Sequence, residues 1–183
     1  MDMSGKLDED ESYFEEEVEP PRKSFDATLL NEPLKVLPAR RPLVFTPEAS
    51  VTAAVRAMQR ERRGCVLITT DGTCDSKLLG IFSDRDVLYR IVDRGRNPAL
   101  LPLREVMTAD PECVPREATI AWVLNRMAVG GFRHVPVVDA GGHPHSVVSV
   151  RDVVDFLVEF FPREVLNLPP EFNRPISTRR EGG

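Results

Sequence analysis

The chain has 183 residues, of which 42% are hydrophobic and 29% charged, and its formal net charge is −5. This composition is typical of a soluble globular protein, and the length suits one compact domain or two small halves that share a core. No apolar run approaches the roughly 18–20 residues that span a bilayer, and the N-terminus lacks the apolar stretch of a secretory signal. We therefore expect a cytoplasmic protein without a membrane segment.

The cysteines and histidines favour neither disulfides nor a metal site. Cys65, Cys74 and Cys113 are odd in number and contain no CxxC pair, and a reducing compartment disfavours disulfides. Only three histidines are present, whereas a zinc site needs three or four ligands at structured spacing. We expect no bound metal and no required cofactor.

The negative charge is concentrated at the N-terminus. Residues 1–21 carry nine acidic side chains and one lysine, whereas the remaining 162 residues carry 23 basic and 20 acidic side chains. An acidic stretch with few apolar residues cannot bury enough surface to order itself, so residues 1–30 are predicted to form a disordered tail. Two roles stay open for it: solubility, or competition with a phosphate-bearing ligand.

The rest of the chain contains an internal repeat. Residues 45–51 (FTPEASV) match residues 114–120 (VPREATI) at an offset of 69, and residues 83–88 (SDRDVL) match residues 149–154 (SVRDVV) at an offset of 66. Self-similarity at a nearly fixed spacing indicates two copies of one structural unit.

In the first copy, Ser50 is typical of a helix N-cap, and apolar residues follow it at the i, i+3, i+4, i+7 spacing of a buried helical face. These residues are Val51, Ala54, Val55 and Met58. Two short runs rich in apolar and β-branched residues, 65–68 and 78–82, then predict a hairpin of two strands. A second helix is expected to begin near Ser83.

The second copy repeats this order, with an N-cap at Thr119, strands at 135–138 and 146–148, and a second helix from Ser149. Each copy therefore has the order β-α-β-β-α. Because a unit of about 65 residues buries little core alone, we expect an α/β (α+β) fold in which the copies pack through their sheets with pseudo-two-fold symmetry. The predicted domains are residues 31–97 and 98–162, followed by a C-terminal extension at 163–183.

Three segments resemble the cystathionine β-synthase (CBS) domain: residues 104–108 (REVMT), 133–139 (RHVPVVD) and 80–86 (GIFSDRD). The resemblance covers residues 33–161 and identifies a tandem pair, often called a Bateman module. It implies a regulatory protein, such as an energy sensor, that binds AMP, ADP, ATP or S-adenosylmethionine in the cleft between the repeats. It also implies a homodimer and a separate effector protein, which the sequence does not name.

The two Ser-x-x-Asp motifs are the strongest candidates for ligand contacts. Ser83 with Asp86, and Ser149 with Asp152, lie at the start of a predicted helix, where a hydroxyl can donate to a phosphate or ribose oxygen. One turn later, the aspartate can accept hydrogen bonds from the two ribose hydroxyls. The same spacing is also that of a capping box, in which both side chains satisfy the helix terminus. Both interpretations stay open.

Further candidates follow from the resemblance. Arg133 and His134 precede a central strand where similar proteins place basic residues near phosphates, and Arg85 and Arg151 lie inside the motifs. Gly80 would let the backbone approach the ligand, although the second copy has Ser146 at that place. An adenine slot is expected at family-equivalent positions, each of which could equally be plain core. These positions are Thr46, Val66 and Val135, together with Val44 and Val114.

No catalytic constellation is present: the chain lacks a Gly-x-Ser-x-Gly elbow, a Walker loop and an HExxH sequence. We therefore expect a regulatory protein rather than an enzyme. The alternative is an interaction scaffold without a ligand. Nucleic-acid binding ranks last, because the small positive charge outside the tail forms no basic stripe in the sequence.

Overall fold

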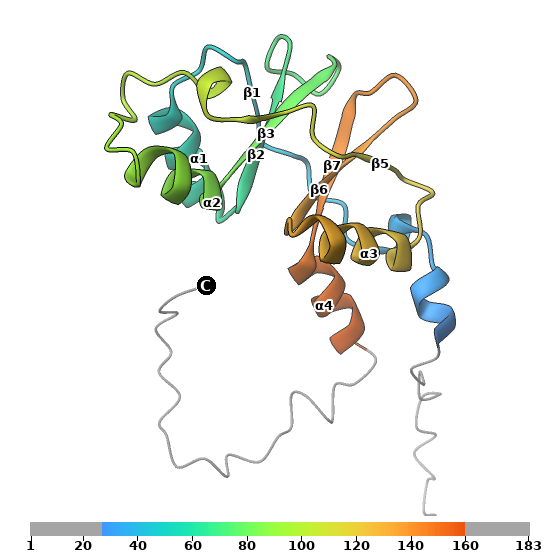
Figure 1. Cartoon of the computed structure of the whole chain (residues 1–183). Helices are drawn as coiled ribbons and strands as arrows, with labels where there is room; N and C mark the ends of the chain where they lie inside the picture. The colour runs from blue at the N-terminus through green and yellow to red at the C-terminus, as the bar shows by residue number, and fades with distance from the viewer. Residues whose placement is uncertain (1–26, 160–183) are drawn as a thin grey trace, which may run out of the picture.

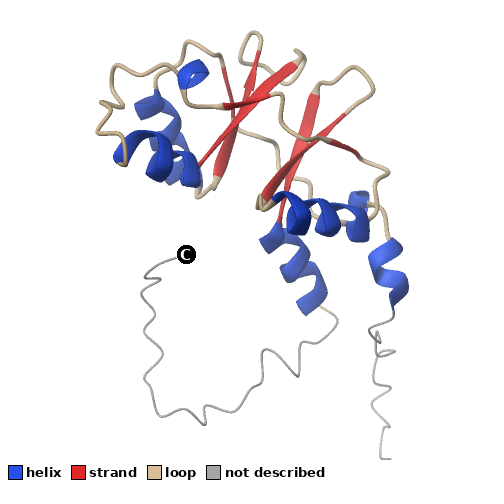
Figure 2. Cartoon of the chain, viewed as in Figure 1, coloured by secondary structure: helices blue, strands red, loops and turns tan. Residues whose placement is uncertain are grey.

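The structure, a computed structural model, describes residues 27–159. Most of the predicted acidic tail and all of the predicted C-terminal extension lie outside these residues. Figure 1 shows two units side by side, each with its helices below its strands, and Figure 2 shows the same arrangement by element type. In the described part of the chain, no helix is long and apolar enough to cross a membrane.

The first unit contains a four-stranded sheet of order β1-β2-β3-β4, in which β1 is parallel to β2 and the other neighbours are antiparallel. Its elements are β1 (Val44–Phe45), α1 (Val51–Glu61), β2 (Cys65–Thr69), β3 (Leu78–Ser83), α2 (Asp84–Asp86), the π-helical segment η3 (Val87–Val92), the 3-10 turn η4 (Leu103–Glu105) and β4 (Thr108–Ala109). The predicted strands at 65–68 and 78–82 are confirmed.

The second unit contains a three-stranded sheet of order β5-β6-β7, with β5 parallel and β7 antiparallel to β6. Its elements are β5 (Val114–Pro115), α3 (Ile120–Gly130), β6 (His134–Val138), β7 (Pro144–Ser149) and α4 (Val150–Val158). Two 3-10 turns, η1 (Ala27–Asn31) and η2 (Leu34–Val36), precede β1. The predicted α/β fold of two pseudo-symmetric repeats is confirmed.

The first helix of each unit begins where the N-cap residues predict. The Ser50 hydroxyl accepts a hydrogen bond from the Ala53 amide at 3.2 Å, and the Thr119 hydroxyl accepts one from the Trp122 amide at 3.2 Å. Each cap satisfies a backbone donor that has no partner within its own helix. The matching caps show that the repeat extends from the sequence to local hydrogen bonding.

Each hydrophobic core includes residues from outside its own unit. The segment before the first unit packs into the second core, and the segment before the second unit packs into the first core. Leu34 and Leu37 are buried in the second core, whereas Leu103 and Val106 are buried in the first. The Leu34 amide donates to the Ala118 carbonyl at 2.9 Å, and its counterpart 69 residues later, the Leu103 amide, donates to the Ala49 carbonyl at 2.9 Å. The units are therefore interlocked. The domain boundaries at 31–97 and 98–162 stay a prediction.

The second helices of the two units differ. In the first unit the chain leaves α-helical geometry after Asp86, and the Asp93 amide donates to the Leu88 carbonyl five residues earlier at 3.0 Å. In the second unit α4 is a regular α-helix over the corresponding positions. Single π-helical segments are rare and are often found at functional sites. Helical periodicity in the sequence did not predict this one.

Candidate functional site

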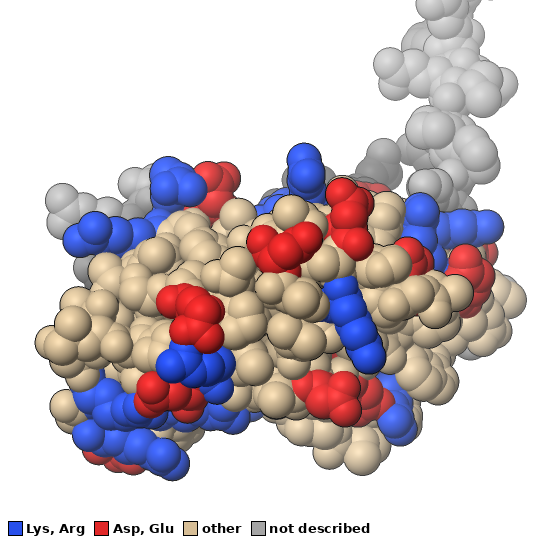
Figure 3. All heavy atoms as spheres, turned by 90° about the horizontal axis from the view of Figure 1, so that it is seen from above, with Lys and Arg blue, Asp and Glu red and all other residues tan. Residues whose placement is uncertain are grey.

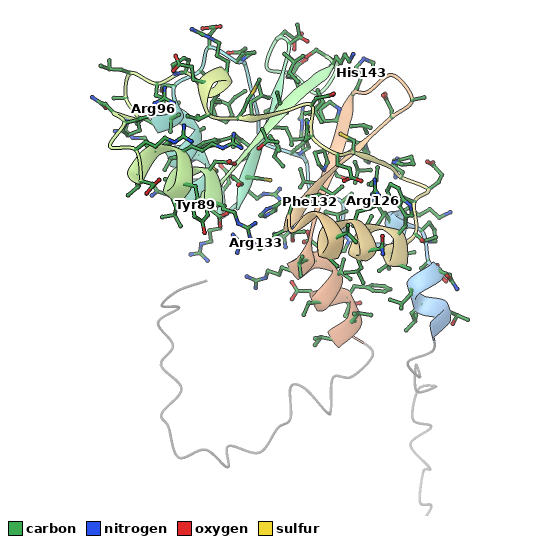
Figure 4. All side chains as sticks on the ribbon, viewed as in Figure 1. Tyr89, Arg96, Arg126, Phe132, Arg133 and His143 are labelled. Atoms are coloured by element: carbon green, nitrogen blue, oxygen red, sulfur yellow. The ribbon has the colours of Figure 1, made fainter. Side chains whose placement is uncertain are left out.

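A cavity of about 290 Å³ lies between the two units. The first unit contributes the end of β3 and the start of its second helix, and the second unit contributes residues 130–134. The segment that links the units, residues 101–113, is called the crossover below. It contributes Thr108, Pro111 and Glu112. Figure 4 shows Phe132 and Arg133 at this junction. The volume is close to the lower end of the range for small-molecule sites, roughly 300–1,000 Å³.

Both Ser-x-x-Asp motifs form capping contacts of the same kind. The amide and hydroxyl of Ser83 donate to Asp86 Oδ2, each at 2.8 Å, and those of Ser149 donate to Asp152 Oδ2, each at 2.7 Å. The capping interpretation therefore describes both motifs. Of the two motifs, only the first, with Ser83 and Asp86, lines the cavity between the units, which is called the large cavity below to distinguish it from the small one at Asp152.

Arg90 is a cavity residue that the sequence analysis missed. Its Nε lies 3.1 Å from Asp86 Oδ1, and its Nη1 donates to the carbonyls of Val106 at 2.7 Å and Met107 at 2.6 Å. The i, i+4 spacing of an aspartate and an arginine on one helix was the available signal. At the matching position the second unit has Phe156, which carries no charge.

Two arginines cross the boundary between the units at the cavity. Arg133 of the second unit pairs with Asp84 of the first at 3.0 Å, and Arg85 of the first donates from Nη1 to the Gly131 carbonyl of the second at 2.6 Å. The Arg85 guanidinium forms no ion pair with any of residues 27–159. The tertiary structure thus brings Arg133 to the Ser83 motif, which lies about 50 positions earlier in the sequence.

His134 lies in the wall of the same cavity and packs against the backbone of the first unit. A Cβ added at Gly64 would lie 2.6 Å from His134 Nε2, so the ring occupies the space that the glycine leaves. Burial lowers the pKa of His134, and the opposing effect of the Asp84 carboxylate is smaller. The ring is accordingly neutral at pH 7.

Acidification should destabilise the fold through His134. Because the folded-state pKa lies below the value of free histidine, about 6.5, the unfolded chain binds more protons as the pH falls through that value. We expect the melting temperature to decrease between pH 7 and pH 5, and to decrease less in His134→Gln. Thermal unfolding at several pH values measures this effect. The same decrease in both proteins would show that other groups cause it.

The second motif borders a much smaller cavity. Asp152 lines a cavity of about 20 Å³, together with Leu34, Leu37 and Ser146, and this volume suits about one water molecule. Neither Ser149 nor Arg151 lines it or the cavity between the units. A larger hollow of about 720 Å³ adjoins it at Ala39, Arg116 and His145, and Asp152 does not line that hollow. In this structure the second motif therefore has no cavity of nucleotide size at its own aspartate.

The remaining predicted site residues lie elsewhere in the fold. Val66 and Val135 are buried in the two cores, and Thr46 packs beside the Gly72 turn. A Cβ added at Gly80 would lie 2.6 Å from Met107 Sδ and 3.0 Å from the Thr108 carbonyl oxygen, so the crossover, not open space, lies against this glycine. Thr46, Val66, Gly80 and Val135 do not line the large cavity. Its apolar surface comes from Ile81, Pro111 and Phe132.

The chain is similar to known proteins in sequence and in fold. A family model described as the CBS domain matches residues 34–93 and 103–159. The CBS domain-containing protein CBSCBSPB3 of Arabidopsis thaliana is 34% identical over 110 residues, which are 60% of this chain and 19% of that protein. A solved protein with CBS domains from Burkholderia ambifaria aligns with a TM-score of 0.61 and 26% identity, covering 69% of this chain and 90% of that chain.

A third similarity concerns the fold alone. The CBS domain pair of protein MJ0100, solved in complex with 5′-methylthioadenosine and S-adenosyl-L-methionine, aligns with a TM-score of 0.62 and 17% identity, covering 69% of this chain and 99% of that chain. The chain spans less than a fifth of the length of the Arabidopsis relatives CBSCBSPB3 and CBSCBSPB2. The two family-model matches cover more than half of the chain and coincide with its two structural units, so the chain belongs to the CBS domain family.

Proposed function

We propose that this CBS pair is a regulatory module that binds one adenosyl ligand, an adenine nucleotide or S-adenosylmethionine, between its two units and transmits the binding to a partner protein. The observation that supports it is the convergence of Ser83, Asp86, Arg85, Arg133 and His134 on one cavity. These residues come from both units, so a ligand that contacts them all is sensitive to the relative position of the units.

The cavity offers a chemically suitable contact for each part of a nucleotide. The Asp86 carboxylate, whose side chain is 12% exposed, can accept hydrogen bonds from ribose hydroxyls. Arg85 and Arg133 at the unit boundary can donate to phosphate oxygens, for which a guanidinium has the matching geometry. The adenine ring can pack against the apolar surfaces of Ile81, Pro111 and Phe132.

The state of two of the three cysteines favours a regulatory role over catalysis. Burial raises the pKa of the Cys65 thiol to about 12, and burial also raises the pKa of Cys113. A protonated thiol is a poor nucleophile, because the thiolate is the reactive form. Neither cysteine lines the large cavity. We therefore propose that the chain is a non-catalytic sensor.

A thermal-shift screen tests the proposed function. Purified protein is heated with AMP, ADP, ATP, S-adenosylmethionine or GTP, and without ligand. A ligand at 100 times its dissociation constant adds about 2.7 kcal/mol to the free energy of unfolding, which raises the melting temperature by several degrees. A shift with adenosyl compounds and none with GTP is the expected result. A flat profile at millimolar concentrations would favour the ligand-free scaffold instead.

We propose that the partner protein is a second copy of this chain. The second helices of both units expose apolar side chains on matching faces, with Leu88, Tyr89 and Val92 in the first unit and Val154 in the second exposed by 49–66%. Large apolar side chains gathered on an exposed helix are typical of an interface. Charge favours protein over nucleic acid as the partner, since Figure 3 shows basic and acidic side chains interspersed over most of the face seen from above, with one denser basic group at the lower left.

A charge placed on this surface should disrupt the dimer. We expect the protein to elute as a dimer and Leu88→Lys to elute as a monomer, because burying an unpaired ammonium in an apolar interface is costly. Size-exclusion chromatography with light scattering measures the mass. Val129→Lys is the matched control, since Val129 is 78% exposed on α3, outside the proposed interface. A monomeric parent protein, or a dimeric Leu88→Lys, would contradict this interface.

A further inference from the structure

Arg90 holds together two walls of the large cavity. Its Nε lies 3.1 Å from Asp86 Oδ1. On its other side, Nη1 donates to the carbonyls of Val106 and Met107, and Nη2 donates to the Thr108 hydroxyl at 3.0 Å. The helix that carries the ligand-binding aspartate and the crossover that faces it are thus joined by one side chain.

The geometry of the guanidinium explains why an arginine is needed here. It is planar and carries five N–H donors in a fixed fork. In this structure the donors are directed to a carboxylate on one side and to two carbonyls and a hydroxyl on the other. A lysine could satisfy one side, but its single ammonium cannot reach both. The distance between Asp86 and the crossover is therefore set by a rigid group.

The second Ser-x-x-Asp motif has no arginine at the corresponding position of its helix. At the position of Arg90 the second unit has Phe156, on the regular helix α4. In the first unit, Arg90 lies within the π-helical segment η3, and the open cavity lies beside it. The first unit has the arginine, the π-helical segment and the open cavity together. At the corresponding places the second unit has a phenylalanine, a regular α-helix and a cavity of only about 20 Å³.

We propose that Arg90 is a positioning residue for ligand binding: it orients the Asp86 carboxylate toward the ribose and keeps the crossover wall at a fixed separation from it. This inference rests on the proposed function. Arg90 acts through Asp86, whose Oδ2 already accepts two hydrogen bonds from Ser83. With Oδ1 held by Arg90, the carboxylate presents a single orientation to the sugar.

The test is the discrimination between ATP and 2′-deoxy-ATP, measured by isothermal titration calorimetry on the full chain. An aspartate that accepts from the 2′-hydroxyl should make ATP bind about tenfold more tightly, since this is the contribution of one hydrogen bond to a charged group. In Arg90→Gln the carboxylate is no longer oriented, and we expect the ratio to fall close to one. Arg94→Gln is the matched control, because Arg94 follows η3 and does not line the cavity. It should keep the tenfold ratio.

Two further variants separate positioning from general loss of structure. Arg90→Lys keeps the charge, folds with less perturbation and should lose most of the discrimination. In an Asp86→Asn background, Arg90→Gln should cause a smaller loss of ATP affinity than in the parent protein, because only its effect on the crossover wall is left and residues that act through one another are not additive. A merely structural role would give additive losses and an unchanged ratio.

The outcomes for the two proposals are distinguishable. If the parent protein binds ATP with the expected preference and Arg90→Gln and Arg90→Lys keep the tenfold ratio, the positioning role is overturned and the proposed function stands. If the parent protein binds neither compound nor any adenosyl compound of the thermal-shift screen, the proposed ligand site fails and the positioning role fails with it.

Discussion

Replacing Asp86 with alanine should reduce the affinity for the adenosyl ligand by roughly 10- to 100-fold, the effect of losing a hydrogen-bond acceptor worth about 1.5–3 kcal/mol. Asp86 lines the open cavity between the units. The variant should therefore show little ligand-induced stabilisation at concentrations that saturate the parent protein. Thermal shift and calorimetric titration measure the two quantities.

Asp152→Ala is a closely matched control for this experiment. Asp152 caps its helix through the same two donors as Asp86, the amide and hydroxyl of the serine three residues earlier. Each alanine substitution should cost about 0.5–2 kcal/mol of stability through loss of the cap. Only Asp86→Ala should lose ligand affinity, because the cavity that Asp152 lines is only about 20 Å³. Equal loss of affinity in the two variants, or none in Asp86→Ala, would contradict a single site at the first motif.

Leu103→Ala should destabilise the protein by about 2–5 kcal/mol, the usual cost of removing a leucine side chain from a packed core. Leu103 is fully buried in the first core, although it lies in the segment that leads into the second unit. Its substitution leaves a cavity between the crossover and the first sheet, where the backbone cannot relax because the Leu103 amide donates to the Ala49 carbonyl.

The control for Leu103 lies three residues earlier in the same segment. Leu100 is 83% exposed, so Leu100→Ala should change the stability by less than about 0.5 kcal/mol. Chemical denaturation measures both free energies of unfolding. If Leu103→Ala were as mild as Leu100→Ala, the crossover could not be an integral part of the first core, and the interlocked arrangement of the units would be wrong.

The interlocked arrangement also bears on signalling. The segment 101–109 places Leu101, Leu103 and Val106 in the first core, forms β4 beside β3, and contributes Thr108 to the lining of the cavity. A ligand can shift the relative position of the units only if it binds one arrangement more tightly than another. A ligand bound as proposed would contact both units and the crossover, since all three line the cavity, and this would provide the structural means for such a difference.

The sequence by itself determined the local structure and the repeat. The N-caps at Ser50 and Thr119, the helical periodicity that follows them and the hairpin strands depend on neighbouring residues, whose spacing is visible in the chain. The two Ser-x-x-Asp motifs are visible for the same reason, although their spacing left a capping box and a ligand site both open. Because the two copies share these local patterns, the order of elements and the paired architecture could also be predicted.

The tertiary structure alone decided which of these residues meet. Arg133 lies beside the first motif because the units pack against each other, and Arg90 reaches Val106 because the crossover returns to the first core. The cavity at Asp152 is far smaller than the cavity at Asp86, a difference that a pattern shared by both copies cannot reveal. Val66 and Val135 are apolar in either role, so only packing shows that they belong to the cores. Local periodicity specifies the elements, whereas the volume between them depends on side chains that are distant in the sequence.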